Sequence, residues 1–83
     1  MDVRILVGTN IGRLRRERGL SQEQFCELAG VTQSYLSQIE NGHVNLGLLG
    51  LNDIAAAFGI HPRRLLDELV DPSEFDDHAN NDR

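Results

Sequence analysis

The sequence predicts an all-α fold, and three kinds of local signal support that prediction. Residues that favour helix starts, such as Ser21, Thr32 and Pro62, stand ahead of apolar segments. Apolar residues within those segments recur at spacings of three and four, the period of one helix face. Gly follows several of them, and Gly adopts the left-handed backbone that ends many helices. We therefore expect one small domain built from five short helices.

The clearest helical signals form a pair in the middle of the chain. Ser21 and Gln24 match an S-x-x-Q capping box, and Gly30 is placed to end the helix that they begin. Thr32 can cap a second helix that ends at Asn41–Gly42. Because only a few residues separate the two helices, the spacing predicts a helix-turn-helix.

The second helix of this pair carries an arc of uncharged polar residues. At about 100° per residue, Leu36 and Ile39 fall on the opposite side and would dock the helix. The polar arc consists of Gln33, Ser34, Ser37, Gln38 and Asn41. Gln pairs bidentately with adenine in the major groove, and Ser can donate to or accept from any base. An ordinary solvated face is the alternative interpretation, but within a helix-turn-helix the arc indicates contact with DNA bases.

Several segments of the chain resemble the Xre/lambdoid-repressor family in both order and spacing. They are N-I-G-R-L-R-R-E-R-G-L-S-Q (10–22), A-G-V-T-Q-S (29–34), I-E-N-G (39–42) and I-A-A-A-F-G-I (54–60). The resemblance spans Gly8–Leu69 and implies a five-helix, lambda-repressor-like DNA-binding domain. A small domain of this kind also resembles phage Cro proteins and restriction–modification controller proteins.

The resemblance and the residues together suggest roles for individual side chains. We expect Gln33, Ser34, Ser37 and Gln38 to face DNA bases. Contacts to the DNA backbone are expected from Gln22, Arg13, Tyr35, Asn41 and His43. The family resemblance further implies that Gln22 braces Gln33 and that Arg15 and Glu40 form a buried, structural ion pair, since a charge buried alone is strongly unfavourable. Arg16 and Arg18 are expected on a solvated basic face.

Outside the central pair, the boundaries of the helices are less sharply marked. The first helix is expected to run from a Thr9 cap to about Arg18, and residues 1–7 either extend it or form an arm. Further helices are expected over about 48–58 and 62–70, the latter begun by Pro62. Leu46 and Gly47 stand where the family has Pro and then Ser or Thr, so exposed apolar surface is expected near Leu48.

The last predicted helix has more apolar residues than a small core can bury. Its apolar face consists of Leu65, Leu66 and Leu69, and we assign part of it to a homodimer interface. The domain is expected to span residues 1–70. Residues 71–83 form an acidic tail that is expected to be disordered, with a partner-binding tail anchored by Phe75 as the alternative.

The charge distribution separates the domain from the tail. The net charge is −5; residues 1–70 carry seven Arg against eight acidic residues, and residues 71–83 carry Arg83 against five. No apolar run reaches membrane-spanning length, so a cytoplasmic protein without membrane contact is expected. Cys26 is the only cysteine, and we expect a buried small side chain in preference to a redox sensor or metal ligand.

These observations predict a regulator of transcription. We expect a homodimer that binds a pseudo-palindromic double-stranded operator with half-sites roughly 34–36 Å apart, with RNA polymerase as a further possible partner. The alternative is a protein-interaction module, such as an antitoxin that neutralises a partner and regulates its own operon. No nucleophile–base set and no metal cluster is visible, so neither enzymatic activity nor a cofactor or metal is expected.

Overall fold

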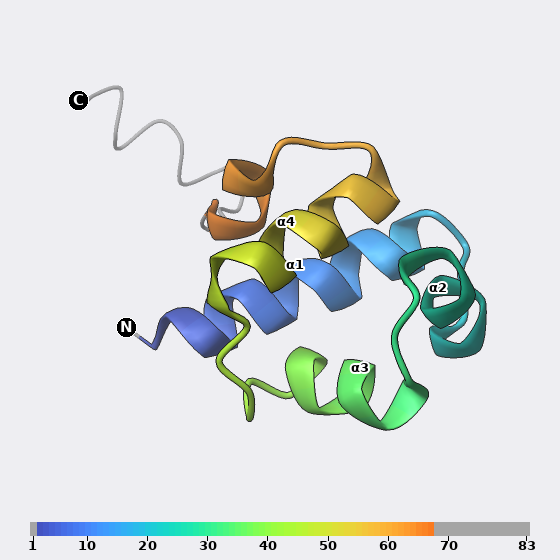
Figure 1. The fold of residues 1–83 in the computed structure, drawn as a ribbon, viewed down its shortest axis with the longest axis horizontal. Helices are drawn as coiled ribbons and strands as arrows, with labels where there is room; N and C mark the ends of the chain where they lie inside the picture. Colours follow the sequence, from blue (N-terminus) through green and yellow to red (C-terminus); the bar gives the residue numbers. More distant parts are fainter. Residues whose placement is uncertain (1, 68–83) are drawn as a thin grey trace, which may run out of the picture.

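The computed structural model describes residues 2–67, which form four α-helices and one 3₁₀ helix (Figure 1). These elements are α1 (Val3–Glu17), α2 (Gln22–Ala29), α3 (Gln33–Glu40), α4 (Gly47–Phe58) and η1 (Pro62–Leu66). No strand occurs within residues 2–67, so the all-α prediction is confirmed there, whereas the count of five α-helices is not. The predicted tail and Leu69 lie outside the described residues.

The first helix begins earlier than predicted. Its N-cap is Asp2, whose carboxylate accepts a hydrogen bond from the backbone N–H of Arg4 at 3.0 Å. The prediction of a Thr9 cap is therefore wrong, and of the two alternatives for residues 1–7 the helical extension is found. The extension buries Val7 in the core, and a helix starting at Thr9 would lack the hydrophobic stabilisation that this burial provides.

The central helix pair has the predicted caps and ends. The Ser21 hydroxyl accepts from the backbone N–H of Gln24 at 3.0 Å, and the Gln24 side chain accepts from the backbone N–H of Ser21 at 2.8 Å. Gly30 follows α2 with φ = 72°, and Thr32 caps α3 by accepting from the Tyr35 N–H at 3.1 Å. The predicted helix-turn-helix is thus confirmed in its local structure.

One core is shared by all five elements. Each element contributes at least one fully buried apolar side chain, for example Ile11, Phe25, Leu36, Ile54 and Leu65. The α1 helix packs against α3 and η1, while α2 packs against α3 and α4. Phe25 and Phe58 stack with ring centroids 4.5 Å apart and so join α2 to α4.

Arg18 belongs to this packing and not only to the solvated face on which it was expected. Its Nη1 donates to the Phe58 carbonyl at 2.8 Å, and its guanidinium lies 5.5 Å from the centroid of the Phe58 ring. A cation at the carboxyl end of α4 is favourable for the helix dipole and for the unpaired carbonyl groups there. Arg18 therefore ties the end of α1 to the end of α4.

The last element is a 3₁₀ helix where an α-helix over 62–70 was predicted. Asn10 is fully buried on α1, and its Nδ2 donates to the carbonyl oxygens of Leu65 at 2.8 Å and Asp67 at 2.7 Å. In a continuing α-helix the Leu65 carbonyl would instead accept from the backbone N–H of residue 69. The chain leaves η1 at Asp67 in an extended conformation.

Leu65, which lies in this 3₁₀ helix, does not have the role predicted for it. Its side chain is fully buried within the protomer, so it cannot lie at a dimer interface as expected. Leu66, next in the chain, remains 44% exposed. Adjacent residues on a helix point in different directions, so Leu65 lies in the core while Leu66 faces outward.

Two glycines bring α1 close to the end of α3. A Cβ atom at Gly8 would overlap the carbonyl oxygen of Ile39, and it would lie 3.0 Å from that of Glu40. Gly42 has φ = 75°, and a Cβ there would lie 2.8 Å from Cγ1 of Ile5. Neither position has room for a side chain, and this close approach fixes α3 on α1. Across the described residues, no helix combines the length and apolar character needed to cross a bilayer.

Candidate nucleic-acid interface

The α3 helix is held by its apolar side and presents its polar side outward. Leu36 and Ile39 are 0% and 2% exposed, as their position on the helix predicted. On the other side, Gln33, Ser34 and Gln38 are exposed and Ser37 is half-buried. The four side chains expected to face bases therefore share one accessible helix face.

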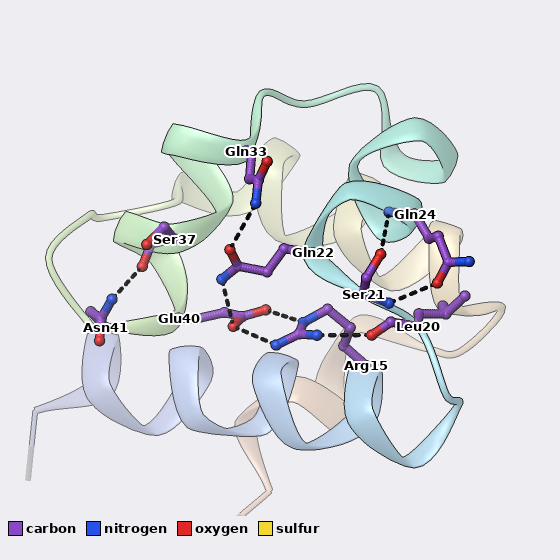
Figure 2. A network of polar contacts seen from close by, with 9 residues as sticks. All are labelled: Arg15, Leu20, Ser21, Gln22, Gln24, Gln33, Ser37, Glu40 and Asn41. Carbon is purple, nitrogen blue, oxygen red and sulfur yellow. Dashed lines mark hydrogen bonds and ion pairs between the residues drawn. The ribbon is translucent and has the colours of Figure 1, made fainter.

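A nearly buried ion pair joins α1 to the end of α3 (Figure 2). Arg15 donates from Nε to Glu40 Oε2 at 2.7 Å and from Nη2 to Glu40 Oε1 at 3.1 Å, which makes the pair bidentate. The remaining Nη1 donates to the Leu20 carbonyl at 2.8 Å. The two side chains are only 11% and 10% exposed, so this expected pair is present in a structural position.

The ion pair continues as a chain of amides toward the start of α3. Gln22 Nε2 donates to Glu40 Oε1 at 3.2 Å, and Gln33 Nε2 approaches Gln22 Oε1 at 3.5 Å (Figure 2). A carboxylate can only accept hydrogen bonds, so Glu40 turns the NH₂ group of Gln22 toward itself and the oxygen toward Gln33. Gln33 is then left with its own oxygen and one N–H free to face outward.

The other residues expected at the DNA backbone are spread around this face. Asn41 is exposed, and its Nδ2 donates to the Ser37 carbonyl at 2.8 Å. His43 is exposed in the loop that follows, and Tyr35 is half-buried against the core. All three belong to α3 or to the turn that ends it.

Arg13 is not brought to this face. It lies about 200° around α1 from Arg15, on the side away from α3, and its Nη1 pairs with Glu17 Oε2 at 2.9 Å. Arg16 lies closer to α3: a Cβ at Gly12 would be 3.1 Å from Arg16 Nη1 and 3.4 Å from Glu40 Oε1. Counting helix angles from Arg15 would have separated these two arginines on the sequence alone.

Cys26 is a buried side chain of α2, as predicted. It is 8% exposed, and burial, together with the negative charge of Glu40, raises the pKa of its thiol. The thiol is therefore protonated at neutral pH and is a poor nucleophile or metal ligand. Within residues 2–67 no group of three or more His, Cys, Asp or Glu side chains is arranged to hold a metal ion.

An apolar groove lies beside the carboxyl end of α3. It has a volume of about 550 Å³ and is bordered by the start of α1, the α3–α4 loop, the start of α4 and η1. Val3, Leu48 and Leu66 line it and are 53%, 85% and 44% exposed; Leu49, next to Leu48, is 82% exposed. The exposed apolar surface predicted near Leu48 is thus present, and it adjoins the groove.

Comparison with known proteins places this geometry in a family. The sequence profile of the helix-turn-helix family matches residues 11–65. The chain belongs to the helix-turn-helix family. It is 43% identical over 74 residues, 89% of its own length and 91% of the other, to the uncharacterized HTH-type transcriptional regulator y4dJ of Sinorhizobium fredii. These matches confirm the predicted membership of the Xre-like family of regulators.

Two solved structures extend the comparison of this helix-turn-helix protein. The restriction–modification controller protein C.AhdI from Aeromonas hydrophila superposes with a TM-score of 0.71 at 35% identity, over 75% of this chain and 94% of that one. SinR, a master regulator for biofilm formation solved in complex with DNA, superposes with a TM-score of 0.67 at 37% identity, over 74% and 98%.

Proposed function

We propose that this helix-turn-helix protein is a sequence-specific DNA-binding regulator of transcription. The observation that carries the proposal is the exposed polar face of α3, held rigidly by Leu36 and Ile39 and oriented by the Arg15–Glu40 pair. Its amides and hydroxyls are the groups that read base edges in the major groove. The likeness to SinR, which was solved in complex with DNA, supports DNA as the partner of this protein.

Within this proposal, Gln33, Ser34, Ser37 and Gln38 contact bases. Gln22, Tyr35, Asn41 and His43 contact the DNA backbone. Gln33 reaches the DNA already braced by Gln22, and this spares part of the rotamer entropy, up to roughly 2 kcal/mol, that a free Gln side chain loses when it is fixed. Selection of bound duplexes from a random pool tests the proposal, and failure to enrich any sequence would contradict it.

Gln38→Ala should relax the preference at a single operator position. Because a bidentate base contact is worth about 1–3 kcal/mol, the selected base and its competitors should converge in affinity by that amount. The measurement is a set of Kd values for duplexes substituted one position at a time. Asn52→Ala, which removes an exposed amide from α4, is the matched control and should change none of them.

We also propose that the protein binds as a homodimer to a pseudo-palindromic operator. The apolar groove at the start of α4 supports this, because it offers Leu66, Leu48 and Val3 as exposed contacts for a second copy. The groove adjoins the carboxyl end of α3, so a dimer formed there would present both α3 helices together. Half-sites would then lie roughly 34–36 Å apart.

Leu48→Asp is expected to shift the protein toward monomers. Leu48 is 85% exposed, so a charge there leaves the protomer intact but is unfavourable in an apolar interface. Sedimentation velocity over a range of concentrations should show dimers of the wild type and lighter species of the variant. Leu28→Asp, on an exposed leucine of α2, is the control and should keep the wild-type association. A wild type that is strictly monomeric at high concentration would contradict the proposed interface.

The likeness to C.AhdI supports a controller-type regulator. In such a system the concentration of the protein is itself the input, because the monomer–dimer equilibrium sets how much of the operator is occupied. A dimer held by a small apolar groove would suit that role, since its dissociation constant can fall within the range of cellular concentrations.

A further inference from the structure

The proposed DNA-binding face is unusually poor in positive charge. No Arg or Lys occurs between Arg18 and Arg63, a stretch that contains all of α2, α3 and α4. The same stretch carries Glu23 and Glu27 on the exposed surface of α2. Any ionic contact to phosphate near α3 must therefore come from another element.

Most arginines of the described residues already have a partner. Ion pairs link Arg4 to Asp2 at 2.9 Å, Arg13 to Glu17 at 2.9 Å, Arg15 to Glu40 at 2.7 Å and Arg64 to Asp67 at 3.4 Å. Arg18 donates to the Phe58 carbonyl. Within residues 2–67 this leaves Arg16 and Arg63 as the arginines with neither an acidic partner nor a side-chain hydrogen bond. Arg63 lies in η1, which lies across α1 from α3 (Figure 1).

Of these two arginines, Arg16 is the one that lies beside the proposed interface. A Cβ atom placed on Gly12 would lie 3.1 Å from Arg16 Nη1 and 3.4 Å from Glu40 Oε1, so both atoms lie next to Gly12. The same Glu40 oxygen accepts a hydrogen bond from Gln22. Arg16 thus lies at the edge of α1 that adjoins Gln22 and the start of α2, and its side chain is exposed. From this edge a long guanidinium side chain can reach a phosphate next to the one that Gln22 would contact.

We propose that Arg16, and not Arg13, makes the ionic contact to a DNA phosphate, once per protomer, while uncharged groups make the remaining backbone contacts. This inference rests on the proposed function. Each neutralised phosphate contributes about −0.9 to the slope of log affinity against log salt, so a dimer should show a slope of about −1.8. Affinity should then fall only about twelvefold between roughly 50 and 200 mM salt, against about 10³–10⁵-fold for a protein with 6–10 phosphate contacts.

The test measures this slope with a labelled duplex of the most enriched sequence from the random pool. Wild type, Arg16→Gln and Arg13→Gln are each titrated at several salt concentrations. Arg16→Gln is expected to lose most of the slope, so that its Kd changes less than about twofold over the same range. Arg13→Gln makes the same change of charge on the same helix and is expected to keep the wild-type slope.

The possible outcomes separate this inference from the function on which it rests. A wild-type slope steeper than about −4, an unchanged slope for Arg16→Gln, or a slope lost in Arg13→Gln would each overturn the inference while leaving DNA binding intact. A pool from which no duplex is enriched would overturn the proposed function, and this inference with it.

Discussion

Replacing Arg15 with Met is expected to lower the free energy of unfolding by about 3 kcal/mol, because removing one partner leaves the other charge buried and unpaired. Glu40 is 10% exposed and would retain only the hydrogen bond from Gln22. The Leu20 carbonyl would also lose its side-chain donor. Urea denaturation followed by circular dichroism measures the loss, which for a domain of this size corresponds to a melting temperature lower by more than about 10 °C.

Two further variants make the assignment of the Arg15 effect specific. Arg13→Met breaks the pair with Glu17, whose side chain is 56% exposed, and should change stability by less than about 1 kcal/mol. The double variant Arg15→Met/Glu40→Met removes both charges and should recover much of the loss seen in Arg15→Met. If Arg15→Met unfolds like the wild type and loses only DNA affinity, Arg15 contacts DNA and the structural assignment is wrong.

The Arg15–Glu40 pair also connects stability to the proposed function. Glu40 accepts from both Arg15 and Gln22, and Gln22 in turn meets the side chain of Gln33. The same carboxylate therefore holds α3 on α1 and sets the direction of the amide beside the first residue of α3. Stabilising and recognising side chains form one network, although the sequence separates Arg15 from Glu40 by 25 positions.

What the sequence could predict depended on how local the determinants were. The α2–α3 pair was predictable to the residue because its ends are set by neighbours, as in the reciprocal bonds of Ser21 and Gln24. The start of α1 was not predictable in this way, because Asp2 and Thr9 are equally good caps in the sequence. The burial of Val7 decides in favour of Asp2. The 3₁₀ helix at the end of the described residues could not be predicted from neighbouring residues either. Its Leu65 carbonyl accepts a hydrogen bond from Asn10, which is 55 positions away in the sequence.

The residues of the candidate site divide in the same way. The polar face of α3 followed from helical periodicity, and its side chains are exposed or half-buried as that periodicity indicates. Arg13 and Arg16 could also have been separated by helix angles, because the predicted Arg15–Glu40 pair marks the side of α1 that meets α3. The sequence indicated only that some leucines would be exposed, and it did not predict the groove. The groove is lined by residues that are distant in the sequence, such as Val3, Leu48 and Leu66.

Gly8→Ala is expected to destabilise the fold by about 3 kcal/mol, at the upper end of the range for overpacked sites. The added Cβ would overlap the Ile39 carbonyl oxygen and crowd that of Glu40, and both belong to the backbone of α3. Backbone atoms cannot turn aside as a flexible side chain does, so α3 would have to move away from α1. The gain of about 1 kcal/mol in helix propensity from Gly to Ala offsets only part of this effect.

Gly50→Ala separates crowding from helix propensity. It makes the same substitution inside α4, where the nearest atom to the new Cβ is Cδ2 of the Leu46 side chain at 3.3 Å. Because that side chain can shift, the propensity gain should dominate and the melting temperature should stay level or rise. Gly8→Ala should instead lower it by more than about 10 °C and weaken DNA binding, because α3 no longer sits where Gln22 meets Gln33. Equal melting temperatures for the two variants would show that α1 and α3 are not held in the close contact that buries Ile39.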